Sequence, residues 1–183
     1  MNHVMLDLET MGTSGNAAIL AIGAVQFCPI EGKIGEKFYV TVDLESAVQM
    51  GGIIDAPTVL WWLQQSAEAR APFAKQGEHI NVALADFHNW VKSLVDDTKV
   101  IQMWGNASTF DNVILQSAYQ RSCITLPWKF WGDRCYRTMK NLFPEIKLKR
   151  VGTGHNAVDD AESQALHLIE IYKRVINGPG ELS

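Results

Sequence analysis

The stretch Met5-Leu6-Asp7-Leu8-Glu9-Thr10 places two carboxylates two positions apart inside an apolar run. Successive side chains of a strand point to opposite faces, so Asp7 and Glu9 share one face while Leu6 and Leu8 share the other. Two like charges on a half-buried strand are costly unless a positive charge lies between them. Because Mg²⁺ and Mn²⁺ prefer hard oxygen ligands, the pair predicts such a cation; a solvated acidic face on an edge strand is the alternative.

The segments that follow this stretch predict further strands. Residues 17–27 are apolar and rich in β-branched side chains, as in a central strand, and Gly23 within them suits a bulge or a close approach. Residues 36–42 alternate, so the first third of the chain predicts an antiparallel meander. Residues 99–104 predict one more strand.

Helical periodicity and capping residues predict five helices. They are expected at 55–63 with Asp55 as cap, at 80–95, after a cap at Ser108 or Thr109, at 133–143, and at 156–175 before Asn177-Gly178-Pro179. Residues 43–52 show no clear periodicity, and residues 122–130 indicate irregular or strand-like structure. Strands followed by alternating strands and helices predict an α/β fold, a mixed sheet with helices packed on it, in one domain over residues 1–183.

Length and composition are those of a globular protein, with 183 residues, 47% hydrophobic and 20% charged. Neither a signal sequence nor an apolar run of membrane length is visible, so we expect a soluble, cytoplasmic protein with no membrane partner. Cys28, Cys123 and Cys135 are odd in number and widely spaced. This spacing predicts reduced thiols and favours neither disulfides nor a zinc site.

The formal net charge of −4 is unevenly distributed along the chain. Residues 129–150 hold seven basic side chains against Asp133 and Glu145, a local excess of +5 that leaves −9 for the rest. The overall balance argues against nucleic-acid binding through bulk charge. The basic segment indicates either a solvated face or an edge that follows phosphates beside an acidic metal site.

Two further segments carry candidate acids. Asp111 opens the helix after the fourth predicted strand, where a carboxylate can also act simply as a capping charge. In the run from His155 to Asp160, the two end residues are five apart, which on one helix separates them by roughly 140°. Both can face one site only if His155 lies in the glycine-flanked loop before the helix. We predict that Asp160, rather than Asp159, faces the site, because Asp160 lies nearer the apolar stripe of the helix.

Taken in order, three motifs resemble those of the DEDDh 3′-5′ exonucleases, which have a ribonuclease H-like fold. They are the D-x-E strand with its threonine, the N-x-x-x-F-D segment from Asn106 to Asp111 and the H-x-A-x-x-D segment from His155 to Asp160. The segments Trp61-Trp62-x-x-Gln-Ser and Lys129-Phe130-Trp131-x-x-Arg134 are similar to the branch with the DexA-type phage exonuclease and a mycobacterial 3′-5′ exoribonuclease. The resemblance covers nearly the whole chain.

The resemblance implies that four carboxylates hold two Mg²⁺ or Mn²⁺ ions and that His155 is the general base. These carboxylates are Asp7, Glu9, Asp111 and Asp160. Two cations can activate a water and stabilise the leaving 3′ oxygen, and histidine side chains titrate near neutrality. The implied reaction is 3′-5′ hydrolysis of single-stranded nucleic acid or 3′ overhangs to nucleoside 5′-monophosphates, with RNA slightly favoured over DNA. A homodimer is a possible assembly.

Other residues are candidates for substrate binding. Thr10 and Met11 follow the first acids and, as in the family, would contact the terminal nucleotide; roles in the turn and the core are the alternative. Trp61 and Trp62 point about 100° apart on a helix, so one is expected in the core while the other, for which we choose Trp61, stacks on a base. The remaining candidates are Asn106, Phe110 beside a candidate ligand, and Arg134 as a phosphate clamp.

Two alternatives to this enzyme stay open at the level of sequence. One is a catalytically silent nucleic-acid-binding or adaptor domain that keeps the fold. The other is a phosphodiesterase restricted to very short oligonucleotides. The intact set of four carboxylates and one histidine favours an enzyme over a silent domain, because the loss of any one of them would mark the latter.

Overall fold

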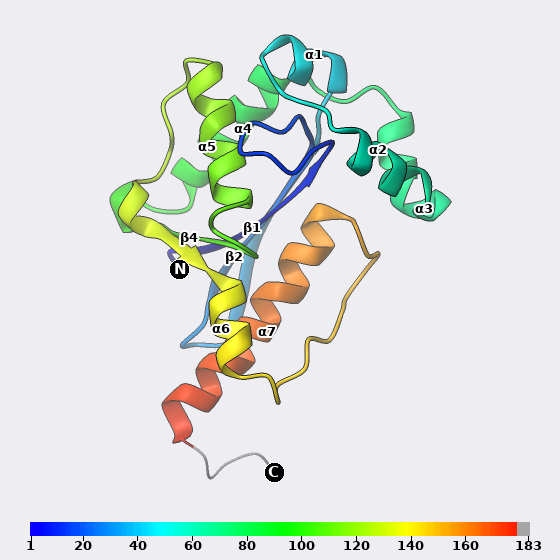
Figure 1. Cartoon of the computed structure of the whole chain (residues 1–183). Coiled ribbons are helices and arrows are strands. Elements are labelled where there is room, and N and C mark those ends of the chain that lie inside the picture. Colours follow the sequence, from blue (N-terminus) through cyan, green and yellow to red (C-terminus); the bar gives the residue numbers. More distant parts are fainter. Residues whose placement is uncertain (179–183) are drawn as a thin grey trace.

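The computed structural model describes residues 1–178, and its centre is a five-stranded mixed sheet (Figure 1). The strand order is β3-β2-β1-β4-β5, with β1 in the middle. The strands are β1 (His3–Thr10), β2 (Ile19–Cys28), β3 (Lys33–Thr41), β4 (Gln102–Gly105) and β5 (Asp133–Cys135). β1, β2 and β3 pair antiparallel, whereas β1, β4 and β5 pair parallel. The predicted N-terminal meander and mixed sheet are therefore confirmed.

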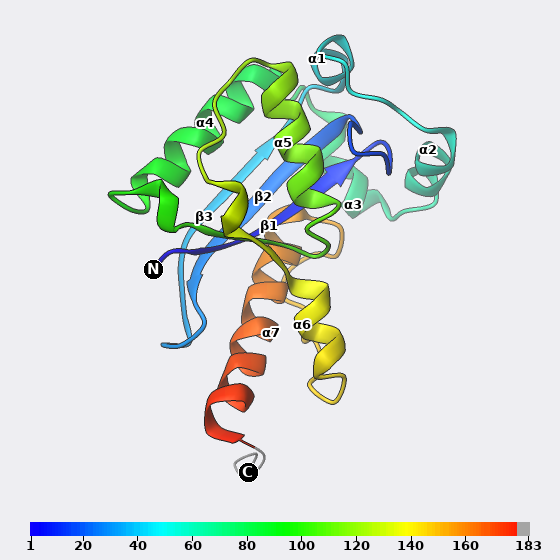
Figure 2. The same ribbon diagram turned by 60° about the vertical axis from the view of Figure 1, so that its left-hand side comes forward.

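Helices cover both faces of the sheet (Figure 2). α4 (Ile80–Ser93) and α5 (Asp111–Arg121) pack on one face, and α6 (Tyr136–Leu142) and α7 (Ala157–Asn177) pack on the other. Successive side chains of β1 point to opposite faces of the sheet. Leu6 lies in the core under α4 and α5, and Met5 lies in the core under α7. Asp7 and Glu9 alternate in step with Met5, so they point to the α7 side.

A close approach at Gly23 fixes the start of α7 on the sheet. Gly23 is the register partner of Asp7 in the ladder between β1 and β2. A Cβ atom at this position would lie 2.2 Å from the carbonyl carbon of Ala157 and 2.3 Å from the amide nitrogen of Val158. Only glycine lets two backbones come this close. The first turn of α7 therefore lies beside Asp7.

Three short helices lie between β3 and α4. α1 (Leu44–Gln49) forms where the sequence showed no periodicity, and its cap is Asp43, which accepts from the Ser46 amide. Six residues contain too few turns for an apolar period to be visible. α2 (Ala56–Leu63) is capped by Asp55, as predicted, and α3 (Ala67–Arg70) follows it.

The start of α5 differs from the prediction. Phe110 is its N-cap and makes no capping bond through its side chain, so neither Ser108 nor Thr109 caps this helix. The amides of Phe110 and Asp111 donate instead to the carbonyl of Ala107. A backbone turn, and not a serine or threonine hydroxyl, therefore precedes this helix, which begins at Asp111.

The edge of the sheet also differs from the prediction. β5 occupies the first three residues of the predicted helix 133–143, because they pair with β4, and α6 begins only at Tyr136. Residues 122–130 form no strand; Trp128 is buried in the core, and a 3-10 turn covers Phe130–Gly132. Another 3-10 turn, Thr98–Val100, occupies the start of the predicted strand 99–104.

The last helix ends close to its predicted stop. α7 extends to Asn177, and Gly178 follows with a left-handed φ of 73°, while Pro179 lies outside the described residues. Cys28, Cys123 and Cys135 are free thiols. Among residues 1–178, no helix is both long enough and apolar enough to cross a membrane.

Candidate active site

The carboxyl end of β1 and the first turn of α7 bring three carboxylates together. One oxygen from each of Asp7, Glu9 and Asp160 lies within 4.8 Å of the other two. Glu9 is only 7% exposed, and Asp7 and Asp160 are half-buried, so the cluster is partly shielded from solvent. Because these three side chains offer only oxygen donors, the cluster fits a hard divalent cation such as Mg²⁺ or Mn²⁺.

Asp111 lies beside this cluster but is held separately. It is the first residue of α5 and is 3% exposed. Its Oδ1 accepts from the amide of Leu8 at 3.3 Å, and its Oδ2 accepts from the amide of Ala107 at 3.4 Å. Asp111 and Asp7 line a cavity of about 190 Å³, whereas the three-carboxylate cluster lines another of about 230 Å³. Asp7 therefore faces both of these acidic cavities.

Burial raises the pKa values of three of these acids, and neighbouring carboxylates add to the effect at Asp7 and Glu9. Burial, followed by the charges of Asp160 and Asp111, raises the pKa of Glu9 to about 8. Burial also raises the pKa of Asp7 well above its usual value. The pKa of Asp111 rises only to about 6, because hydrogen bonds from backbone amides oppose the effect of burial. The protein alone does not supply the charge that would keep these groups ionised, and a bound cation would supply it.

Two residues that the sequence analysis missed contact the cluster directly. Gln164 donates from Nε2 to Oδ1 of Asp7 at 2.8 Å, and Arg150 forms an ion pair with Asp160. Gln164 follows Asp160 by four residues on α7, a spacing that places both on one helix face and could have been found in the sequence. Arg150 belongs to no periodic element, so only its charge pointed to it.

His155 lies in the loop before α7, as predicted, and lines the same cavity as the cluster. Its backbone has a left-handed φ of 61°. Its amide donates to Oδ2 of Asp160 at 3.0 Å, and its ring meets the Trp61 ring at right angles with centroids 5.0 Å apart. The loop therefore brings the imidazole to the acids from outside the helix.

Asp159 contacts the loop instead of the cluster. Its Oδ2 accepts from the amide of Thr153 at 2.8 Å. Gly152 has a φ of 64° and passes so close that a Cβ atom there would lie 2.2 Å from the Asp159 carboxyl. The choice of Asp160 as the acid that faces the cluster agrees with this geometry.

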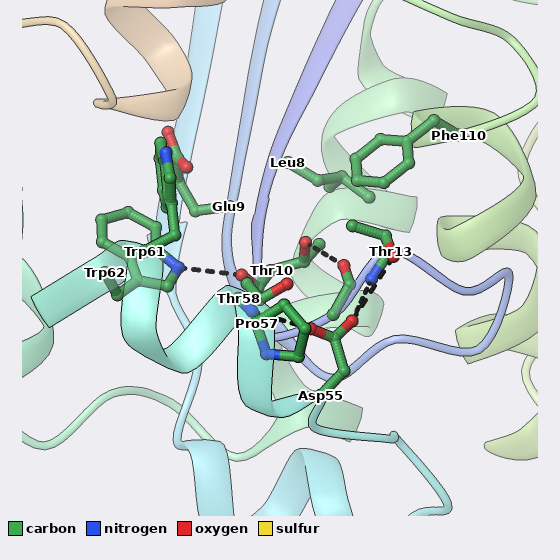
Figure 3. Close-up of a pocket in the computed structure, with 11 residues that line it drawn as sticks. Leu8, Glu9, Thr10, Thr13, Asp55, Pro57, Thr58, Trp61, Trp62 and Phe110 are labelled. Carbon is green, nitrogen blue, oxygen red and sulfur yellow. Dashed lines mark hydrogen bonds between the residues drawn. The ribbon is translucent and has the colours of Figure 1, made fainter. Parts of the chain in front are cut away.

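A larger cavity of about 730 Å³ adjoins the acids (Figure 3). Apolar side chains form much of its wall, namely Leu8, Pro57, Trp61, Trp62 and Phe110. Glu9 lines both this apolar cavity and the cavity of the cluster. The indole of Trp62 donates to the carbonyl of Thr10 at 2.9 Å, which ties α2 to the end of β1. Trp62 is 4% exposed and Trp61 40%, so one of the pair is in the core, as predicted.

Four of the predicted substrate-binding residues line these three cavities. Thr10, Trp61 and Phe110 line the apolar cavity, and Asn106 lines both acidic cavities. The hydroxyl of Thr10 donates to the carbonyl of Gly12 at 2.8 Å, which also gives it a role in the turn.

Met11 and Arg134 lie elsewhere. Met11 packs against the core and lines a separate cavity, because its backbone pairs with Ala18 and Asp55 and holds the turn in place. The guanidinium of Arg134 donates to the carbonyls of Trp131 and Asp133, and it lines none of the three cavities. Two other basic residues of this region, Arg137 and Lys140, each line an acidic cavity.

The fold, a mixed sheet in this order with acids at the end of its central strand and at the starts of two helices, is that of the ribonuclease H-like exonucleases. The chain belongs to the family of the 3′-5′ exoribonuclease Rv2179c-like domain, whose model matches residues 2–172. The exodeoxyribonuclease of Enterobacteria phage T4 is 27% identical over an alignment of 161 residues, and the match covers 75% of this chain and 70% of the phage protein. The resemblance to DEDDh exonucleases is confirmed.

Solved structures share the fold at low sequence identity. The nuclease domain of 3′hExo, a DEDDh family member bound to rAMP, has a TM-score of 0.62 and 13% identity, covering 96% of this chain and 92% of that domain. Pop2p of S. pombe, in its Mg²⁺- and Mn²⁺-bound form, has a TM-score of 0.61 and 14% identity, covering 98% and 86%. At these identities the similarity shows the fold alone.

Proposed function

We propose that this chain is a Mg²⁺- or Mn²⁺-dependent 3′-5′ exonuclease that removes nucleoside 5′-monophosphates one at a time from a single-stranded end or a 3′ overhang. The strongest support is the convergence of four carboxylates and His155 on two small cavities beside an apolar cavity large enough for a nucleoside. The family match supports the 3′-5′ direction. Residues 1–183 would then form a single exonuclease domain.

The donor set supports two metal ions. Asp7, Glu9 and Asp160 would hold one ion, and Asp7 with Asp111 would hold the other, because Asp7 faces both acidic cavities. Bound there, the two cations would activate a water and stabilise the leaving 3′ oxygen. The metal-bound form of Pop2p supports Mg²⁺ or Mn²⁺ as the ions.

His155 would be the general base of this reaction. Imidazole can accept a proton near neutral pH, and the residue lines the cavity where the acids converge. The bond from its amide to Asp160 keeps the loop beside those acids. Rotation of the side chain would bring a ring nitrogen within reach of the attacking water, whose proton it accepts.

The apolar cavity would receive the nucleoside at the 3′ end. Trp61, which is 40% exposed, and Phe110 offer aromatic faces on which a base can stack. Thr10 lies at the same cavity and would contact the sugar or base, while Asn106 would contact the phosphate from the acidic cavities. Met11 and Arg134 do not line these cavities, and their contacts with the substrate stay predictions.

We favour RNA over DNA as the substrate. The matched family is that of an exoribonuclease domain, although the phage relative is an exodeoxyribonuclease. Contact with the 2′-hydroxyl would separate the two polymers. The cytoplasm stays the expected location, and a homodimer stays a prediction that light scattering on the purified protein tests.

Matched single strands of RNA and DNA, labelled at the 5′ end, test the proposal in Mg²⁺, Mn²⁺ or EDTA. We expect a ladder that shortens from the 3′ end with either metal and full-length strands in EDTA. Asp7→Asn and His155→Ala should each slow the reaction by about 10²-fold or more, since one removes a ligand and the other the base. Wild-type rates in both variants would contradict the assigned site.

The same assay separates the two other functions. Binding without shortening, at any metal concentration, would indicate a silent nucleic-acid-binding or adaptor domain. A series of strand lengths from dinucleotides upward tests the second alternative. Hydrolysis of only the shortest strands would indicate a phosphodiesterase for very short oligonucleotides.

A further inference from the structure

The cavity that holds the carboxylate cluster is also lined by two cations. Lys140 comes from α6, and Arg150 comes from the segment that joins α6 to α7. The proposed catalytic set of four acids and one histidine uses neither of them. A cavity that combines buried acids with an arginine and a lysine can accept a metal ion and an anion side by side.

Arg150 faces this cavity because its segment is extended. Leu148 and Arg150 line the acidic cavity, whereas Lys147 and Lys149 line a separate cavity against α7. This alternation is that of an extended chain, in which successive side chains point to opposite sides. Lys149 is therefore a matched control, since it is a basic neighbour in the same segment that does not line the acidic cavity.

The ion pair with Asp160 leaves much of the Arg150 guanidinium available. A guanidinium has five N–H donors in a planar fork that matches phosphate oxygens. Among the described residues its one acceptor is the Asp160 carboxylate, and the Arg150 side chain is 57% exposed. Once a bound cation neutralises Asp160, Arg150 loses the charge that holds it and can turn to another anion.

We propose that Arg150, together with Lys140 on the same cavity, binds the scissile phosphate of the substrate and then the 5′-phosphate of the released nucleotide. This inference rests on the proposed function. A nucleoside in the apolar cavity would direct its 5′-phosphate past Glu9, which lines both cavities. Arg150 makes and breaks no covalent bond; its donors stabilise the negative charge on the phosphate oxygens.

Calorimetric titration of AMP and of adenosine into the Mg²⁺-loaded protein tests the inference. The two ligands differ only in the phosphate, and AMP is a product, so turnover does not interfere. We expect the wild type to bind AMP more tightly than adenosine. Arg150→Ala should weaken AMP binding by about 10- to 100-fold and leave adenosine binding unchanged. Arg150→Lys should recover part of the loss, because lysine keeps the charge without the fork, and Lys149→Ala should match the wild type.

Equal losses for AMP and adenosine, or AMP binding by Arg150→Ala as tight as by Lys149→Ala, would overturn the inference. Titration with Mn²⁺ in the absence of nucleotide adds a readout that is independent of phosphate. Arg150→Ala should bind Mn²⁺ at least as tightly as the wild type, because Asp160 loses a competing cation. Weaker Mn²⁺ binding would show instead that Arg150 acts by positioning Asp160, and the inference would fail.

The strand-shortening assay distinguishes this failure from failure of the proposed function. If the wild type shortens strands and Arg150→Ala works at the rate of Lys149→Ala, the phosphate-binding role is wrong and the exonuclease stands. If the wild type shortens no strand with either metal, the exonuclease is wrong and the phosphate-binding role falls with it.

Discussion

Gln164 determines how Asp7 is presented to the two acidic cavities. The Gln164 side chain is 5% exposed, and its Nε2 donates to Oδ1 of Asp7 at 2.8 Å. This bond lowers the pKa of Asp7 against the larger effect of burial, so it favours the ionised form that binds metal. Oε1 of Gln164 is buried without a hydrogen-bond partner among the described residues, so this side chain acts on the site through its Nε2 donor. Gln164 is therefore a positioning residue.

Gln164→Leu should weaken metal binding while keeping most of the side-chain volume. Loss of a partner that orients a metal ligand typically costs 10- to 100-fold in metal affinity, so we expect the half-maximal Mg²⁺ concentration of the reaction to rise by about 10-fold. Gln116→Leu is the control, because Gln116 donates to Asp133 at 2.8 Å, away from the metal cluster. An equal rise in both variants would show that the effect is general destabilisation.

Trp61→Ala should weaken substrate binding through the lost stacking surface. A base stacked on an aromatic ring contributes about 1–3 kcal/mol, so the KM of a single strand should rise by about 10-fold. The ring also meets His155 edge-on, so a smaller loss in kcat is expected. Leu63, exposed on the same helix and absent from the cavity wall, gives the control variant Leu63→Ala. An unchanged KM in Trp61→Ala would rule out stacking.

The residues of the candidate site were predictable where they sit on regular elements. The period of a strand placed Asp7 and Glu9 on one face, and the period of a helix favoured Asp160 over Asp159. The same helical period reaches Gln164. Arg150 had no such signal, because its segment belongs to no strand or helix and the sequence does not show which side of it faces the cavity. Arg134 was a candidate for its charge and its place in the segment 129–134, and one of its guanidinium nitrogens donates to backbone carbonyls.

At the level of elements, the site depends on how closely α7 approaches β2. Gly23 is opposite Asp7 in the sheet, and the backbone of Ala157 and Val158 lies directly against it. Any larger residue must push the first turn of α7 outward, since backbone atoms cannot yield as a flexible side chain can. That turn carries Asp160, so one contact between two elements sets the spacing of the carboxylates.

Gly23→Ala should therefore reduce stability and activity together. Overpacking of a filled contact typically costs about 1–3 kcal/mol, and displacement of Asp160 should lower the rate further at temperatures where the protein is folded. Gly35→Ala, in the neighbouring strand, is the control, because its Cβ would meet the ends of the Gln26 and Met1 side chains. Thermal melting and the strand-shortening rate measure both effects. Equal rates in the two variants would contradict the role of the contact.

Long elements were predictable from the sequence and short ones were not. The apolar run of β2 and the stripe of α7 extend over enough residues to show their period. α1 has six residues and β5 three, and β5 is extended because it pairs with β4, a partner distant in sequence. Helix propensity alone predicts that the helix includes the three residues of β5. Pairing between distant segments decides such cases.

Across the whole molecule, the fold buries carboxylates that it does not neutralise. Asp7, Glu9 and Asp111 all have raised pKa values, chiefly through burial. Only a few side chains of the basic segment 129–150 lie near these acids. Among them, Arg150 forms an ion pair with Asp160. The buried acids therefore lower the free energy of unfolding of the metal-free protein when they are ionised. That free energy should consequently depend on pH.

The stability of the metal-free protein should fall as the pH rises through the window set by Glu9. The pKa of Glu9 is about 8 in the folded chain, and its ordinary value, which applies to the unfolded chain, is 4.5. Between pH 4.5 and about 8, Glu9 therefore holds a proton in the folded state that it has released in the unfolded state. Raising the pH there favours unfolding. In EDTA we expect Tm to be several degrees lower at pH 8 than at pH 5.5, at about 2–4 °C per kcal/mol for a chain of this size.

Mn²⁺ should reverse this trend, because it binds the ionised carboxylates and stabilises only the folded state. The rise in Tm on adding Mn²⁺ should accordingly be larger at pH 8 than at pH 5.5. Glu9→Gln removes one of the titrating groups and should make the metal-free profile less steep, which separates the contribution of Glu9 from those of the other acids and of surface charges. If the wild type and Glu9→Gln show the same pH dependence in EDTA, Glu9 is not a group that couples stability to pH, and this prediction is wrong.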